Sequence, residues 1–179
     1  MLTVEFDLEG EFRRVFTTQY LVSLSCAADC ARLLPKVDFL VAKTNLRDAL
    51  SHLGIILDPT ATPQTRISNL ACAEEHLRRA GMESYQAVLE RFLGKIIREY
   101  QAYRSKYLQW ERVRNIKIDH AKVKKGIDEI KEELINCRMG KSSPGWAKEI
   151  GGLAGTCSKA SALLAEVKSF SSRHRNAAK

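Results

Sequence analysis

Apolar residues recur every three or four positions along most of this 179-residue chain, a spacing typical of amphipathic helices. Polar and charged residues fill the positions between them, so each helix has one side suited to burial. The pattern predicts four helical regions, at about 11–34, 37–53, 68–110 and 146–170. A further apolar run with heptad spacing follows the third region, at Val123, Ile127, Ile130 and Leu134.

Helix boundaries are predicted at the few residues that break a helix. Pro35 is expected to end the first region and Gly54 the second, while Ser68 or Asn69 can cap the third. The segment DPTATPQT before the third region has two prolines and is expected to form a loop. At the start of the chain, LTVEFDLE alternates apolar and acidic residues but has no second strand to pair with. It is therefore expected to be an extended arm.

These elements predict an all-α fold, an antiparallel helical bundle with a long projecting helix or helical hairpin. We expect a helical bundle over 1–110 and a basic helical extension over 111–179 that packs on the bundle or projects from it. The GGLAG segment of the last region is a weak helix former, so its helicity is left open. Long helices with an apolar face usually pair with another helix, which predicts a homodimer.

Composition narrows the class of protein. Hydrophobic residues make up 45% and charged residues 28% of the chain, as in ordinary globular proteins. Neither a signal peptide nor an apolar run of the roughly 18 residues of a membrane helix is recognisable, so we expect a cytoplasmic protein with no membrane partner. No P-loop, dinucleotide fingerprint, HExxH or GxSxG motif is present, and the five cysteines lack metal-ligand spacing. We therefore expect no cofactor, no metal, and reduced, buried thiols.

Positive charge is concentrated in the middle of the chain. The net charge is +8, yet residues 1–66 contain 7 basic and 8 acidic residues and are nearly neutral. Residues 91–125 contain 11 basic and 3 acidic residues, an excess equal to the net charge of the whole chain. Such a stripe attracts RNA or DNA through counterion release, although the solvated face of a long helix would have the same composition.

Several basic residues in and beside the third helical region are candidates for nucleic-acid binding. Aromatic residues that could stack on bases are interleaved with them, although their spacing is also that of a buried seam. These aromatic residues are Tyr100, Tyr103, Tyr107 and Trp110. The candidate nucleic-acid-binding residues are Arg78, Arg79, Arg98, Arg104, Lys106, Arg112 and Arg114.

One short segment carries residue types suited to RNA cleavage. RDALSH places Arg47, Asp48 and His52 in the second helical region. Metal-free cleavage needs a proton acceptor or donor, which histidine supplies, and a fixed cation on the phosphate, which arginine supplies. Five positions along a helix separate two side chains by about 140°. Both groups therefore reach one phosphate only if the helix end frays or a second subunit contributes one of them.

RDALSH resembles the Arg-x(4 to 6)-His motif of the HEPN superfamily, and the downstream AEEHLRRA resembles the next helix of some bacterial HEPN-like proteins. The resemblance covers about 11–107. It implies a dimeric all-α protein that binds RNA and, as a further step, a metal-independent endoribonuclease of a toxin–antitoxin or defence system. In that role Arg47 would stabilise the phosphate, His52 would act as general acid or base, and Asp48 would orient one of them.

Three alternatives stay open beside this interpretation. A second match, Arg114-Asn115 followed by His120, lies in the basic stretch and is interpreted as a helix surface. In AEEHLRRA, Glu75 and Arg79 have the spacing of an ordinary ion pair on a solvated helix face. The whole chain could instead be a non-catalytic helical module for dimerisation or for binding a partner protein.

Overall fold

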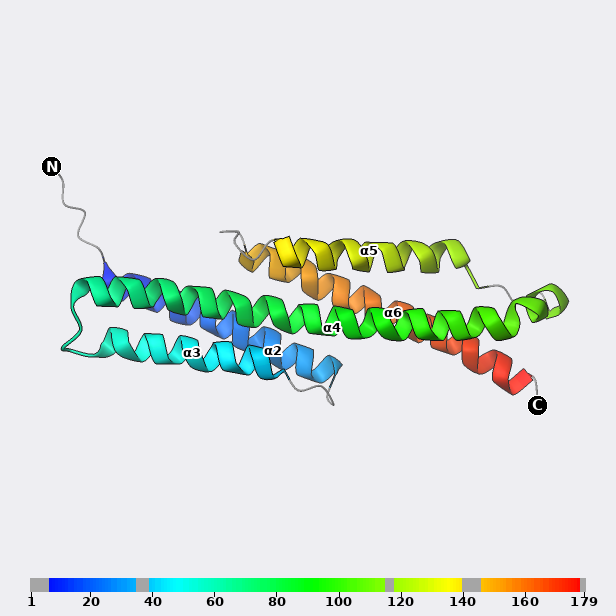
Figure 1. The fold of residues 1–179 in the computed structure, drawn as a ribbon, viewed down its shortest axis with the longest axis horizontal. Coiled ribbons are helices and arrows are strands. Elements are labelled where there is room, and N and C mark those ends of the chain that lie inside the picture. Colours follow the sequence, from blue (N-terminus) through cyan, green and yellow to red (C-terminus); the bar gives the residue numbers. More distant parts are fainter. Residues whose placement is uncertain (1–6, 35–38, 115–117, 140–145, 178–179) are drawn as a thin grey trace. The chain divides into compact units, whose positions relative to one another are not determined.

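The computed structural model describes residues 7–34, 39–114, 118–139 and 146–177, with side chains except at 106–114, 138–139, 146–149 and 173–177. Within these ranges every regular element is helical (Figure 1). The elements are α1 (Leu8–Arg14), the π-helical turn η1 (Val15–Tyr20), α2 (Leu21–Leu33), α3 (Leu40–Leu57), α4 (Pro63–Arg114), α5 (His120–Met139) and α6 (Trp146–Ala177). The prediction of an all-α fold with one long helix is confirmed.

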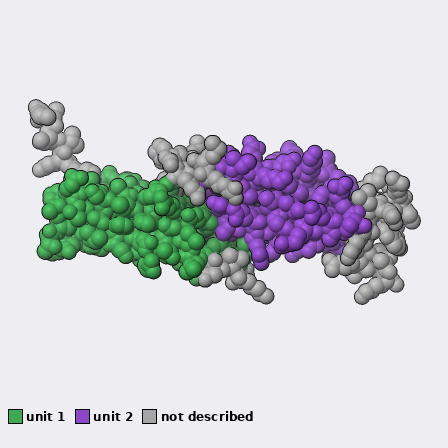
Figure 2. All heavy atoms as spheres, in the orientation of Figure 1, with its two compact units in different colours: residues 1–85, 141–150 green, residues 86–140, 151–179 purple. Residues whose placement is uncertain are grey.

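The chain divides into two compact units, which Figure 2 colours separately. Unit 1 contains Met1–Tyr85 and Lys141–Ile150, and unit 2 contains Gln86–Gly140 and Gly151–Lys179. Within α4, the division between the units falls at Tyr85. A continuous helix has no turn or loop at the point where its packing partners change. The residue pattern therefore gives no signal for this division.

Unit 1 is an antiparallel bundle around one apolar core. Asn45 in the first half of α3 contacts Glu83, and His52 in its second half contacts Asn69, so α3 and α4 run in opposite directions. The buried core lies at the positions that the helical spacing selects. It contains Val15, Leu46, Ala49, Leu53, Ile56, Leu70, Ala73, Leu77 and Ala80.

The first helical region begins earlier than predicted. The Asp7 carboxylate accepts a hydrogen bond of 2.9 Å from the amide of Gly10, and this cap starts α1 at Leu8. Two residues expected in the extended arm, Leu8 and Glu9, are therefore helical. The rest of the expected arm, apart from Asp7, lies outside the described residues.

Gly54 does not end α3, which continues to Leu57. Ile56, two positions later, is buried in the core of unit 1. Burying such a side chain contributes about 1.5–3 kcal/mol, which exceeds the roughly 0.5–1 kcal/mol that glycine costs inside a helix. The prediction of a helix end at Gly54 was wrong because this burial outweighs the glycine.

The start of α4 is set by Thr62 and Pro63. The Thr62 hydroxyl accepts a hydrogen bond of 3.2 Å from the amide of Thr65, and proline is favoured at the first position of a helix. This cap lies about one and a half turns before Ser68, where the sequence predicted the start. Ser68 and Asn69 are instead inside the helix.

Unit 2 is formed by the later part of α4 with α5 and most of α6. The heptad run of α5 is buried, as its spacing predicts: Val123, Ile127, Ile130 and Leu134 are each at most 9% exposed. Lys122 of α5 forms an ion pair of 2.8 Å with Glu166 of α6. The GGLAG segment is helical, and α6 continues beyond the predicted residue 170 to Ala177.

Candidate functional site

The structure places Arg47, Asp48 and His52 on α3 but does not bring them together. Arg47 is exposed, and its guanidinium donates hydrogen bonds of 2.9 and 3.1 Å to the carboxylate of Asp48. His52 is half-buried on the side of α3 that faces α4, where its Nδ1 lies 2.7 Å from Oδ1 of Asn69. Within one copy, Arg47 and His52 therefore have separate partners.

His52 is one of two stacked histidines between α3 and α4. Its ring centroid lies 5.3 Å from that of His76, and the ring planes differ by 19°. Nδ1 of His76 lies 3.0 Å from Oδ1 of Asn45, just as Nδ1 of His52 lies beside Asn69. Each imidazole is thus held at the same nitrogen by an asparagine on the opposite helix.

The two asparagines determine which nitrogen of each imidazole carries the proton. Nδ2 of Asn69 donates to the Thr65 carbonyl at 2.8 Å, and Nδ2 of Asn45 donates to the Glu83 carboxylate at 3.0 Å. With the amide nitrogens so used, each Oδ1 accepts, and Nδ1 of each histidine must donate. In the neutral state both Nε2 atoms then keep a lone pair that can accept a proton.

Asn45, His52, Asn69 and His76 form a polar seam between α3 and α4. The sequence contains a signal for this seam that the sequence analysis did not identify. Asn45 and His52 are seven residues apart, and so are Asn69, His76 and Glu83. Seven residues are close to two helical turns, so each set lies along one line of its helix. Polar residues repeating in this way beside two apolar stripes indicate a buried hydrogen-bonded seam.

Arg78 and Arg79, two of the predicted nucleic-acid-binding residues, share one carboxylate. Arg78 is 8% exposed and donates to Glu75 through Nε at 3.0 Å and Nη2 at 2.6 Å, while Arg79 donates to the same carboxylate at 2.8 Å. The hydrogen bond from Arg78 is the largest of the effects that lower the pKa of Glu75 below its usual range. Both cations therefore already have an anionic partner.

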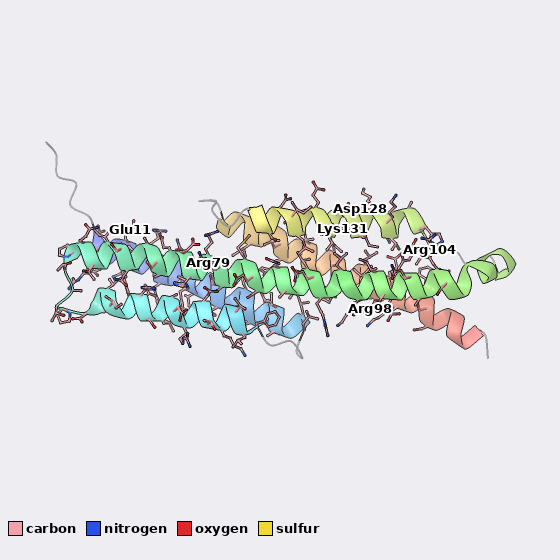
Figure 3. The ribbon with its side chains drawn as sticks, in the orientation of Figure 1. Glu11, Arg79, Arg98, Arg104, Asp128 and Lys131 are labelled. Atoms are coloured by element: carbon pink, nitrogen blue, oxygen red, sulfur yellow. The ribbon has the colours of Figure 1, made fainter. Side chains whose placement is uncertain are left out.

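The described cations of α4 in unit 2 have no such partners among the described residues. Arg98 and Arg104 are exposed (Figure 3), and Arg91 is exposed as well. None of these arginines, nor the half-buried Lys95, makes an ion pair or side-chain hydrogen bond with any residue the structure describes. The remaining predicted residues, Lys106, Arg112 and Arg114, fall among the side chains that are not described.

A hollow of about 430 Å³ lies where α4 passes the beginning of α5 in unit 2. Lys124 and Arg104 contribute its cationic groups, and neither pairs with a described residue. The described residues that line it include no carboxylate. They are Tyr100, Arg104, His120, Ala121, Lys124 and Ile127.

Inside this hollow Tyr100 and His120 are joined. The tyrosine hydroxyl lies 2.8 Å from Nδ1 of His120, and the ring centroids are 5.7 Å apart at an interplanar angle of 56°. His120 also lies against the ring of buried Tyr103, with 6.5 Å between the centroids. The sequence named Arg104, Tyr100 and His120 separately but did not predict that they share one hollow with Lys124.

No family model matches the chain, and neither the curated proteins nor the solved structures include a significant match to it. Among the described residues, no three histidine, cysteine, aspartate or glutamate side chains gather as a metal site would require. Within the same residues, no helix combines the length and apolarity needed to cross a bilayer. A functional assignment therefore depends on the geometry of the sites themselves.

Proposed function

We propose that the protein binds RNA through its phosphate backbone, with the cationic surface of unit 2 as the contact. The observation that carries this proposal is the difference in ion pairing between the described cations of α4 in unit 2 and most of the arginines of unit 1. The α4 stripe of Arg91, Lys95 and Arg98 has no carboxylate partner among the described residues. In unit 1, by contrast, six arginines form ion pairs: Arg13, Arg14, Arg32, Arg47, Arg78 and Arg79.

Unpaired cations are the ones that can bind phosphates. Spacings of four and three residues place Arg91, Lys95 and Arg98 on one face of α4, so they can follow a nucleic-acid strand together. A cation already bonded to a carboxylate would have to break that bond first. Binding through such contacts releases counterions and therefore weakens as salt rises.

The test is the affinity for a fluorescent single-stranded RNA, measured by anisotropy over a range of salt concentrations. Arg91→Gln combined with Arg98→Gln should weaken binding and reduce the slope of log K against log salt by about 0.7 for each phosphate that is no longer neutralised. Arg13→Gln combined with Arg32→Gln is the matched control, because it also removes two exposed arginines but both are ion-paired. Equal weakening in the two double variants, or stronger binding to duplex DNA of the same length, would overturn the proposal.

Cleavage of the bound RNA at Arg47, Asp48 and His52 is a second, separate proposal. The observation that favours it is the contact of 2.7 Å between Nδ1 of His52 and Oδ1 of Asn69, from which we infer that Nδ1 carries the proton and Nε2 can accept one. Nε2 would take the proton of a 2′-hydroxyl, the 2′-oxygen would attack phosphorus, and the 5′-oxygen would leave with a proton from water. Because Arg47 is bonded to Asp48 away from His52, the phosphate would need the arginine of a second copy.

RNA cleavage has its own test. His52→Ala and Arg47→Ala should each abolish the formation of 2′,3′-cyclic phosphate ends without metal, and a mixture of the two variants should recover part of it if the site is shared between copies. Lys43→Ala, at a position of α3 that is exposed like that of Arg47, is the control. Unchanged cleavage in both variants contradicts this site.

The non-catalytic alternative also has a specific observation in its favour. Of the large hydrophobic side chains that are exposed among the described residues, all except Ile135 belong to unit 1. They include Leu21 and Leu24 of α2, 48% and 44% exposed, and Leu57 of α3, 66% exposed. Apolar side chains gathered on one unit are typical of a surface that binds another protein, here a second copy of the chain.

A further inference from the structure

We propose that the hollow between α4 and α5 binds the terminal phosphate of a nucleotide chain. Arg104 and Lys124 would hold the phosphate monoester, and the ring of Tyr100 would stack on the adjoining base. This inference rests on the proposed RNA binding, which it deepens by naming the part of the RNA that this site recognises.

The charge of the hollow fits a phosphate monoester better than a phosphodiester. Arg104 and Lys124 are two fixed cations, and the described lining has no aspartate or glutamate to oppose them. A phosphate monoester carries between one and two negative charges near neutral pH, because its second pKa is about 6, whereas a diester inside a strand carries one. The planar guanidinium of Arg104 can donate two parallel hydrogen bonds to phosphate oxygens, which fixes their orientation.

The position of the hollow at the beginning of α5 adds to this preference. His120 is the first residue of α5, a helix of 20 residues, so the hollow lies at the positive end of the helix dipole. One amide of the first turn, that of Lys122, already donates to the Asp119 carboxylate at 2.9 Å. Asp119 is thereby engaged in capping the helix and is not among the residues that line the hollow.

The volume of the hollow and its remaining lining residues indicate a ligand larger than a lone phosphate. About 430 Å³ falls within the range of small-molecule pockets, roughly 300–1,000 Å³. Ala121 and Ile127 supply apolar surface, and Tyr100 supplies an aromatic ring of the kind on which bases stack. The hydrogen bond between the Tyr100 hydroxyl and His120 holds both rings in place. A nucleotide with its phosphate at the cationic side matches these features.

The larger groove of unit 2 does not fit the same ligand. It has a volume of about 620 Å³ and lies between α5 and α6. Its lining includes three lysines, but also four glutamates that would repel a phosphate. Those acidic residues are Glu129, Glu132, Glu133 and Glu166. Of these two sites, the hollow at Tyr100 is the one whose described lining residues include cations but no carboxylate.

The test compares one short single-stranded RNA in two forms, with a terminal phosphate and with a terminal hydroxyl, at either end in turn. Titration calorimetry of the full-length protein should give at least about tenfold tighter binding for one phosphorylated form. Arg104→Gln and Lys124→Gln should each remove most of this preference, because the affinity for the phosphorylated form should fall much further than the affinity for the hydroxyl form. Lys125→Gln is the control, because this neighbouring lysine is paired with Glu129 and does not line the hollow.

The outcomes separate this inference from the proposed function. Binding of RNA with no preference for a terminal phosphate, or a preference that survives both substitutions, overturns the inference and leaves RNA binding standing. The protein could instead fail to bind any RNA but bind a free nucleoside monophosphate tightly, with Arg104→Gln abolishing that binding. This result supports a phosphate site in the hollow and overturns RNA as the molecule that carries the phosphate. Binding of neither RNA nor nucleotide overturns both. Circular dichroism of the Arg104→Gln, Lys124→Gln and Lys125→Gln variants checks that their helical content is unchanged.

Discussion

The hydrogen bond between His52 and Asn69 decides the chemistry available at this histidine. An imidazole in water prefers to carry its proton on Nε2, but here Nδ1 faces an oxygen that can only accept. The proton is therefore held on Nδ1, and Nε2 is the nitrogen that can take a proton. The same argument applies to His76 and Asn45.

This tautomer can be tested directly. Nitrogen chemical shifts of the imidazoles, measured by NMR at a pH where they are neutral, should show both His52 and His76 protonated on Nδ1. Asn69→Ala should return His52 alone to the Nε2-protonated form, with His76 as the internal control, and should lower the free energy of unfolding by about 0.5–1.5 kcal/mol. A wild-type His52 that carries its proton on Nε2 would contradict the hydrogen bond from Nδ1 of His52 to Asn69.

The cysteines give a second prediction at the scale of single residues. Cys72 is exposed, whereas the other four thiols are buried, and burial raises the pKa of Cys30 to about 12. Because the thiolate is the reactive form, one thiol should react rapidly with a disulfide reagent at pH 8, and the others only after unfolding. Cys72→Ser should abolish the rapid reaction. Rapid reaction of a second thiol in the folded protein would contradict this burial.

At the scale of the helices, two glycines give different expectations for the same substitution. Apart from its chain neighbours and the backbone of its own helix, a Cβ at Gly54 would have no heavy atom within 4 Å, whereas a Cβ at Gly126 would lie 2.6 Å from Cδ2 of Leu163. Gly54→Ala should therefore raise the free energy of unfolding by about 0.5–1 kcal/mol. Gly126→Ala should raise it less or not at all, because Leu163 must move. The free energies of unfolding of both variants are measured by chemical denaturation. An equal increase in the two variants would show that α5 and α6 are less closely packed at Gly126.

The helices themselves could be predicted from the sequence, but their ends could not. Apolar spacing alone places Val123 and Leu134 on the buried side of α5, and both are buried. The end of α3 depends on whether Ile56 finds a core to enter, which is a property of other helices. Local signals such as Gly54 are weaker than that burial, so boundaries follow tertiary packing rather than the residue that breaks a helix.

The candidate sites were predictable only as far as they depend on one helix. The exposure of Arg98 and Arg104 follows from their charge and position, and the pairing of Arg79 with Glu75 follows from their spacing. The partner of His52 is Asn69, 17 residues away on another helix, and periodicity does not identify it. The hollow at Tyr100 likewise requires residues from both sides of the α4–α5 connection.

At the scale of the whole molecule, exposed apolar groups and unpaired cations belong to different units. Among the described residues, unit 1 has nearly all the exposed large hydrophobic side chains and the ion-paired arginines, while unit 2 has the α4 stripe and the cationic hollow. An apolar surface is suited to association between proteins and an unpaired cationic surface to a polyanion. We therefore expect the two units to act separately, with unit 1 in self-association and unit 2 in RNA binding.

Self-association through unit 1 gives the last prediction. Leu21 and Leu24 are three residues apart on α2 and therefore lie on one face of it, and both are about half exposed. Leu21→Glu combined with Leu24→Glu should convert a dimer to a monomer in light scattering coupled to size-exclusion chromatography, without loss of helical content, because neither side chain fills the core. Ile135→Glu in unit 2, where the replaced side chain is 56% exposed, should leave the dimer intact. A wild-type protein that is monomeric at every concentration, or a dimer that dissociates only with Ile135→Glu, would contradict this assignment of the interface to unit 1.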